Sequence, residues 1–463
     1  MRPLWDLPVG RRPSLWRRLT APQLFVGSFT ILIAFGTIGL KFLPGLYTGE
    51  PLNWLDALFT ATSAVCVTGL NVIDPATALT LRGQAFVLLL IQLGGLGMLT
   101  FTSLVILALG GRLSLRQEAL SAGSPMDVGQ HPINPRQLLR DVIIFTVLFE
   151  SVAAGILYLL WVPRLGWEGA AWPALFHSIS AFCNAGFSTF SDSLMSFQQC
   201  PLTLLVLSVQ IVAGGIGFLT LEELYLHAKA RREQRNFRLS IHSRLVLVTT
   251  AVLLVGGWIV YICLEWNAAL SDLPAGHKLT NALFMSATAR TAGFNTIDHA
   301  KASDAGNFTT ILLMSIGGSP GGTAGGLKTT TLSLLLILAW SRFRGRDIAS
   351  VWSRSLRKET TDRAVGLFVI AFATMTMGIL LLTVTESDSP HGGFLMRMFE
   401  AVSAFNTVGL SMGLTPHLSP AGRVIVIVLM FLGRVGPLAL ATALAVTAKA
   451  GKFRYAYEEV VVG

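Results

Sequence analysis

Four stretches of the sequence share a pattern that could bind a bare cation. Each begins with an apolar or aromatic residue, continues through small Ser, Ala or Thr residues, and reaches a glycine followed by Leu or Phe. The stretches are LFTATSAVCVTGLNVID (58–74), LFHSISAFCNAGFSTFSD (175–192), ALFMSATARTAGFNTID (282–298) and MFEAVSAFNTVGLSMGL (398–414). Carbonyl oxygens at such turns can replace the hydration shell of a monovalent ion where several turns meet. The pattern therefore predicts a cation site built from main-chain oxygens.

The glycines of these stretches lie at nearly equal intervals along the chain, which indicates internal duplication. We expect the turns to need glycine because its φ is positive there, or because four backbones meet. One such glycine alone would more simply be a helix-packing residue, but four in register favour the cation site. The residues predicted to offer carbonyl oxygens are Val67, Thr68, Gly69, Asn184, Ala185, Gly186, Thr291, Ala292, Gly293, Thr407, Val408 and Gly409.

A second glycine-rich run, SIGGSPGGTAGGLKTTT (315–331), invites comparison with a phosphate-binding loop. That loop has the pattern G-x-x-x-x-G-K-[ST] and follows a strand. Here Leu327 separates Gly326 from Lys328, so the register fails, and no strand precedes the run. An ATP-driven enzyme is thus a weak rival, and the chain is not expected to be an enzyme.

The composition indicates an integral membrane protein. Hydrophobic residues make up 52% of the chain and charged residues 13%, against about 25% charged in an ordinary soluble domain. Runs of about 20 apolar residues can cross a membrane. The candidate spans are 24–40, 83–111, 142–163, 193–221, 245–264, 305–327, 364–385 and 424–448. The fold class predicted is therefore all-α, with eight transmembrane helices.

The segment before each glycine is too short to cross the membrane. About 12 helical residues span about 18 Å, whereas the hydrocarbon core is about 30 Å thick. These segments should therefore be re-entrant pore helices whose negative dipole ends converge near the midplane and favour a cation. Start signals fit, because Asn53 with Asp56 resembles a capping box, Pro173 suits a first helical position, and Thr280 can cap the third helix.

The predicted architecture is four pseudo-symmetric repeats of span, pore helix, filter turn and span around a central ion pore. The repeats are residues 24–111, 141–226, 245–340 and 364–448, and the glycine-rich run breaks the third. Most of the 35 Lys and Arg residues cluster between repeats or near the termini. By the positive-inside rule, the segments 1–23 and 449–463 are then cytoplasmic. The net charge of +10 follows from this bias, and nucleic acid is not an expected partner.

At the four glycine segments and the glycine-rich break, the chain resembles the Trk/Ktr/HKT superfamily of potassium transporters. It looks most like the membrane subunit of bacterial Ktr-type uptake, and the resemblance covers about residues 24 to 448. It implies K⁺ uptake across the bacterial plasma (inner) membrane through a pseudo-fourfold pore. The filter glycines that would hold K⁺ are Gly69, Gly186, Gly293 and Gly409.

The resemblance also implies a gate below the filter, formed by an intramembrane loop and by the arginine of FLGRVGPL (431–438). A snorkelling lysine at a packing kink is the alternative for Lys328. For Arg434, the alternative is a buried ion pair with Glu150 or Glu222. The gate residues are Gly317, Gly318, Ser319, Pro320, Gly321, Gly322, Thr323, Ala324, Gly325, Gly326, Lys328 and Arg434.

Other charged residues lie close to the filter turns. Arg290 precedes the third turn and either braces it from behind or forms a structural ion pair, which we favour. Asp74, Asp192 and Asp298 follow their glycines. They either raise the cation concentration in the outer mouth or simply solvate loops.

The family resemblance implies a homodimer in membrane lipid, seated on a cytosolic ring of nucleotide-binding regulatory subunits of the RCK type. The basic loops 227–244 and 341–363 either contact this ring or only set orientation. No covalently bound cofactor is expected; K⁺ is the transported ion and Na⁺ is left open as a coupling ion. The alternative function is a secondary transporter of an organic solute with broken helices, which predicts two inverted repeats in place of four direct ones.

Overall fold

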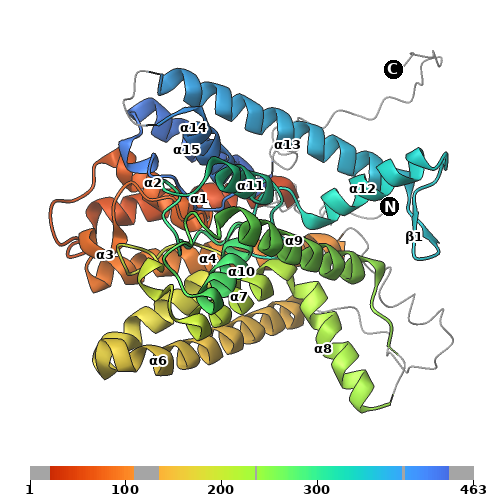
Figure 1. Ribbon diagram of the computed structural model, residues 1–463, viewed down its shortest axis with the longest axis horizontal. Helices are drawn as coiled ribbons and strands as arrows, with labels where there is room; N and C mark the ends of the chain where they lie inside the picture. The colour runs from red at the N-terminus through yellow and green to blue at the C-terminus, as the bar shows by residue number, and fades with distance from the viewer. Residues whose placement is uncertain (1–20, 109–134, 235–236, 388–391, 437–463) are drawn as a thin grey trace, which may run out of the picture.

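In the computed structural model, helices surround the four glycine turns, by which we mean residues 67–69, 184–186, 291–293 and 407–409 (Figure 1). The structure describes residues 21–108, 135–234, 237–387 and 392–436. The predicted C-terminal cytoplasmic segment and nearly all of the N-terminal one lie outside the described residues, as do the ends of the first and fourth repeats.

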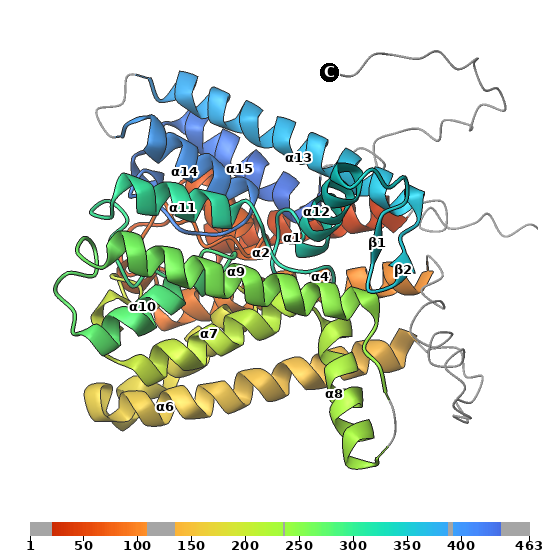
Figure 2. The same cartoon turned by 45° about the vertical axis from the view of Figure 1, so that its right-hand side comes forward.

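Long apolar helices form the outside of the bundle. Two of them, α6 and α13, run along opposite edges in both views (Figures 1 and 2). Of the most apolar 18-residue stretch of α13, only 17% is buried. Most of its apolar side chains therefore face outward, as lipid contact requires. The long helices are α1 (Ala21–Phe42), α4 (Leu81–Ala108), α6 (Pro135–Phe182), α9 (Ile241–Glu265) and α13 (Lys358–Thr385).

Within the described residues, α1, α6, α9 and α13 are each long and apolar enough to cross a membrane. The bent pair α7 (Pro201–Ile216) and α8 (Phe218–Arg232) adds a fifth candidate. The fold is thus all-α and multi-pass. The expected number of eight spans stays a prediction.

Short buried helices lead into the glycine turns. They are α2 (Trp54–Val65), α10 (Ala275–Thr288), α14 (Phe394–Phe405) and the last part of α6, beyond a bend at Gly166, where φ is 75°. The first and last have the expected 12 residues and α10 has 14. They are referred to below as the pore helices.

The local start signals of the pore helices were only partly correct. Asn53 caps α2 by accepting a hydrogen bond of 2.8 Å from the amide of Asp56, as expected. Pro173 does not begin a helix, because α6 continues through it and the bend lies earlier, at Gly166. Thr280 does not cap α10, which begins at Ala275; its hydroxyl donates instead to the carbonyl of Gly276.

The helices that follow the turns differ between repeats. Helix α4 is continuous, α7 and α8 are bent by 104° at Gly217, and α11 (Asp304–Met314) is separated from α12 (Thr329–Phe343) by the Gly-rich loop, residues 315–328. The fourth is α15 (Pro420–Val435). The remaining elements are α3 (Pro75–Ala78), η2 (Met195–Phe197), η3 (Thr415–His417) and an antiparallel hairpin of β1 (Ser350–Val351) and β2 (Arg354–Ser355).

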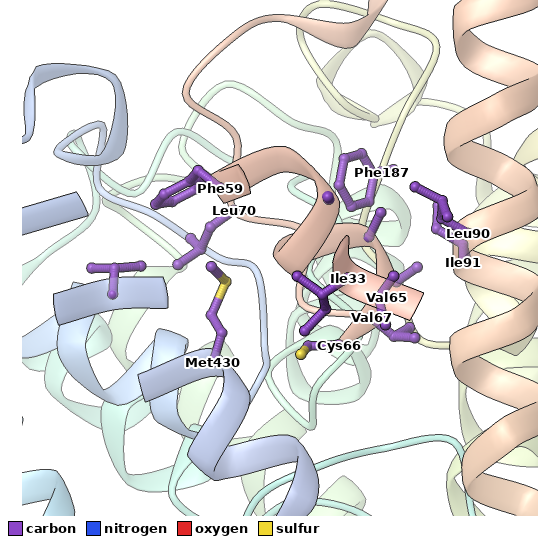
Figure 3. Packing of buried hydrophobic residues seen from close by; sticks show 14 of the residues in the cluster. Ile33, Phe59, Val65, Cys66, Val67, Leu70, Leu90, Ile91, Phe187 and Met430 are labelled. Atoms are coloured by element: carbon purple, nitrogen blue, oxygen red, sulfur yellow. The ribbon is translucent and has the colours of Figure 1, made fainter. Parts of the chain in front are cut away.

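The largest buried apolar cluster joins the first repeat to the fourth around the first glycine turn. Phe59 of α2, Leu70 beyond the turn and Met430 of α15 belong to it, and Phe187 enters from the second repeat (Figure 3). Residues from three repeats thus pack against one turn, so its position depends on the assembled bundle.

Glycines let three of the later helices touch the ends of the pore helices. A Cβ added at Gly94, Gly214 or Gly433 would meet a carbonyl oxygen at the end of a pore helix, at Val65, Phe182 and Phe405 respectively. Any side chain at these positions would push the later helix away from the pore helix. The close approach fixes how far the pore helices extend into the bundle.

We expect Gly433→Ala to destabilise the protein by about 1–3 kcal/mol, because the new methyl group overlaps the Phe405 carbonyl. Thermal unfolding of the detergent-solubilised protein measures this. Gly366→Ala in α13 is the matched control, since no atom lies within 4 Å of its added Cβ and alanine favours a helix. Equal melting temperatures for the two variants would contradict the packing argument.

Candidate functional site

The four glycine turns share one pattern of φ angles. In each, the glycine and the residue two before it have positive φ, while the residue between them does not. The first residues are Val67 (55°), Asn184 (58°), Thr291 (72°) and Thr407 (51°), and the glycines are Gly69 (93°), Gly186 (70°), Gly293 (79°) and Gly409 (92°). Left-handed conformations are costly for β-branched residues such as Val and Thr. Their presence at equivalent positions shows that the surrounding structure imposes this conformation.

The turns meet in a closed ring. A Cβ added at Gly69 would lie 2.5 Å from the carbonyl oxygen of Ala185, and one at Gly186 would lie 2.9 Å from the Cα of Gly293. A Cβ added at Gly293 would lie 2.5 Å from the carbonyl oxygen of Val408. One added at Gly409 would contact the carbonyl oxygen of Thr68, which closes the ring. The twelve predicted residues are therefore brought together, and any side chain at the glycines would strike the next turn.

Hydroxyl groups of the pore helices hold the turns in place. Ser63 accepts a hydrogen bond of 3.1 Å from the amide of Gly69, and Ser403 accepts one of 3.1 Å from Gly409. Ser180 donates to the carbonyl of Phe187 at 2.8 Å, and Thr288 bonds the amide and carbonyl of Phe294 at 2.9 Å. Sequence reasoning missed these residues, although the serine six residues before Gly69 and before Gly409 was a readable signal.

The Gly-rich loop is bonded to the end of α7. The amides of Ser319 and Thr323 donate to the carbonyls of Gly215 (2.8 Å) and Gly214 (3.0 Å). In return, the amide of Phe218 donates to the carbonyl of Gly321 at 3.0 Å. The bend in α7–α8 and the loop thus satisfy each other's backbone groups, as non-helical backbone inside a membrane requires.

The loop also touches two glycine turns of the ring. The amide group of Asn184 lies 3.1 Å from the hydroxyl of Thr323. A Cβ added at Gly326 would lie 2.5 Å from the side-chain oxygen of Asn406, and one at Gly325 would contact Thr407. The loop therefore packs directly against the second and fourth turns.

Two basic side chains, one of them from the loop itself, donate hydrogen bonds to carbonyl oxygens of the loop. Arg434 is 1% exposed and donates to the carbonyls of Thr323 and Gly94, the latter at 3.0 Å. The half-buried Lys328 donates to the carbonyl of Ala324 at 2.7 Å. Within the described residues, the hydrogen bonds of Arg434 go to carbonyls and not to Glu150 or Glu222. Arg434 thus links the loop to α4 of the first repeat.

The other charged residues near the turns have local roles. Arg290, 7% exposed, lies 3.5 Å from the carbonyl of Thr250. The described residues provide it with no acidic partner, so the ion pair we favoured is not found.

Asp74, Asp192 and Asp298 each accept a hydrogen bond from a backbone amide two to four residues further along the chain, at 2.8–3.0 Å. These bonds give the three acids a local role in their loops, and a role in attracting cations stays a prediction.

The glycine run does not have the setting of a phosphate-binding loop. Such a loop follows a strand, but the described segment before this run is α11, and the only described strands are the short β1 and β2.

The fold and the ring define a multi-pass, helical membrane protein in which backbone turns from four parts of the chain converge. A family model described as TrkH, cation transport protein, matches residues 12–455. The chain belongs to this family.

Named relatives agree with this assignment. The chain is 39% identical over 447 residues to Ktr system potassium uptake protein B of Vibrio alginolyticus. The alignment covers 96% of this chain and 95% of that protein. It is 37% identical over 449 residues to potassium/sodium uptake protein NtpJ of Enterococcus hirae, with 96% and 97% covered. The solved potassium transporter TrkH of Vibrio parahaemolyticus matches with a TM-score of 0.72 at 18% identity, over 93% of this chain and 86% of that one. At that identity the likeness concerns the fold alone.

We expect Arg434→Ala to loosen the Gly-rich loop, because the Thr323 and Gly94 carbonyls lose a charged donor. Hydrogen exchange of the loop amides should become about tenfold faster, because the loss of one hydrogen bond from a charged donor raises the equilibrium constant of local opening by that factor. Arg423→Ala on the same helix is the control, since Arg423 pairs with Asp56 instead. Faster loop exchange in both variants, or in neither, would argue against a specific clamp.

Proposed function

We propose that the protein takes up K⁺ along the axis of the ring of glycine turns, with its carbonyl oxygens as ligands. The observation that carries the proposal is the closed contact of four equivalent turns. The two named relatives are potassium uptake and potassium/sodium uptake proteins. The proposed filter consists of the twelve turn residues, with K⁺ held near the four glycines.

The proposed gate is the stretch Gly317 to Gly326 together with Lys328 and Arg434. Three facts support it: the loop packs on two of the turns, it interlocks with the bend at Gly217, and Arg434 binds its carbonyl at Thr323. Two buried or half-buried cations next to the pathway would also repel K⁺ while the loop is in place.

The proposed setting is the bacterial plasma (inner) membrane, with both termini in the cytoplasm and four repeats with the boundaries expected above. The chain would act as a transporter rather than an enzyme, as a homodimer on a cytosolic RCK-type regulatory ring. The name of one relative, a protein of the Ktr system, supports the existence of partner subunits. The name of the other supports Na⁺ as a second transported or coupling ion.

We expect Gly69→Ser to lower the preference for K⁺ over Na⁺ by about tenfold, because the side chain would collide with the Ala185 carbonyl and distort the ring. Rubidium uptake in potassium-uptake-deficient cells, with Na⁺ as competitor, measures this. Gly345→Ser is a matched control, since Gly345 also has positive φ (68°) but its added Cβ meets no atom within 4 Å. Unchanged Na⁺ competition in the folded Gly69 variant would contradict the proposed filter.

Deleting residues 317–326, or replacing Arg434 by Ala, should raise K⁺ flux through the folded protein. For Arg434→Ala we expect about a tenfold shift toward the open state, from the loss of a charged hydrogen bond. Arg434→Lys retains the charge but not the contact with two carbonyls. It therefore distinguishes electrostatic repulsion of K⁺ from the hydrogen bonds that hold the loop in place. A folded variant with normal or reduced flux would exclude the gate.

A further inference from the structure

Two pore helices carry a buried polar side chain at the same position relative to their glycine turn. Glu400 of α14 bonds Ser411, and His177 of α6 bonds Ser188; in both pairs the serine is eleven residues further along the chain. Glu400 and His177 are each 0% exposed. Each pair therefore connects a pore helix to the segment that follows its glycine turn, which is called the exit segment below.

The carboxylate of Glu400 forms two such connections. One oxygen accepts a hydrogen bond of 2.8 Å from the hydroxyl of Ser411, and the other accepts one from the hydroxyl of Thr415 in η3. Ser411 in turn accepts from the amide of Gly413 at 3.0 Å. The exit segment of the fourth repeat is thus tied to its pore helix through both oxygens of one buried carboxyl group.

The His177 ring performs the equivalent task in the second repeat. Its Nδ1 lies 2.8 Å from the carbonyl of Pro173 and therefore holds a proton, while Nε2 lies 2.9 Å from the hydroxyl of Ser188. The ring stacks on Phe190 with centroids 4.9 Å apart, and the amide of Phe190 donates to Ser188 at 2.9 Å. The ring is thereby fixed on both edges and on one face.

Among the described residues, the other two repeats show no such connection. Thr60 is the equivalent residue of the first repeat, and its buried hydroxyl has no hydrogen-bond partner among the described residues. The third repeat has Phe284 there, and its exit segment is held by residues of the second repeat instead. The amide of Asn295 donates to Ser193 at 3.1 Å, and its carbonyl accepts from Leu194 at 2.9 Å. The ring order places the two connected repeats opposite each other.

We propose that the pairs Glu400–Ser411 and His177–Ser188 are filter braces, positioning residues that set the discrimination between K⁺ and Na⁺. A smaller ion is bound well only if the carbonyls move inward, and an exit segment fixed to its pore helix resists that movement. Two braces on opposite sides of the ring keep its carbonyl oxygens from moving inward along the line that joins the second and fourth turns. The proposal rests on the proposed K⁺ uptake and specifies residues outside the ring that determine its selectivity.

The test uses Ser411→Ala and Ser188→Ala in the full chain, expressed in potassium-uptake-deficient cells. For each variant the apparent KM for K⁺, the maximal rate and the inhibition by Na⁺ are measured. We expect each variant to lower the K⁺/Na⁺ preference about fivefold, the equivalent of one net hydrogen bond. Ser411→Thr keeps the hydroxyl and should retain the wild-type preference, which separates the bond from the mere presence of serine.

A matched control is Ser419→Ala. The hydroxyl of Ser419 donates to the buried carboxylate of Glu386 at 2.6 Å where α13 meets the start of α15, so the same chemistry is lost outside the ring. This variant should lower the amount of folded protein, measured by size-exclusion chromatography, without changing the ion preference. A purely structural role of the braces predicts the same behaviour for Ser411→Ala.

The outcomes distinguish this proposal from the proposed function. If the wild-type chain takes up K⁺ but folded Ser411→Ala and Ser188→Ala keep its ion preference, only the braces are overturned. If Ser419→Ala loses preference as strongly as they do, the braces are again overturned. If the wild-type chain gives no K⁺ uptake, the proposed function fails and the braces fail with it.

Discussion

The rest of the structure depends on direct backbone contact between four turns that are distant in the sequence. At each turn the added Cβ of the glycine would strike the next turn, so no side chain can be placed there without opening the ring. Contact at this distance requires that each chain segment arrive at the same depth and leave again within a few residues. This requirement explains why short helices end at the ring and non-helical segments leave it.

Support for the ring comes from backbone groups as much as from side chains. Gly94, Gly214 and Gly433 let later helices touch the carbonyl ends of the pore helices, and serine hydroxyls bond the turns themselves. Arg434 extends the same principle, because the partners found for it are carbonyls of the loop and of α4. A buried guanidinium is tolerated where several carbonyl dipoles face it.

The recurring glycine pattern predicted which turns meet, and it predicted the 12-residue length of α2 and α14. It did not predict the positive φ of Val67 or Thr407, because β-branched residues disfavour that conformation and only tertiary contacts impose it. Pro173 and Thr280 misplaced two helix starts, since such local signals are weak and Gly166 provides the bend. The partners of Arg434 could not be predicted, because a carbonyl oxygen is present at every residue and leaves no trace in the sequence.

The bond between the amide of Phe218 and the carbonyl of Gly321 has a mechanical consequence. Helices α7 and α8 meet at Gly217, whose φ is 95°, and Phe218, the residue just past it, is the one that donates to the loop. A rotation of α8 about Gly217 would displace the Phe218 amide. It would therefore break this hydrogen bond unless the Gly-rich loop moved with it.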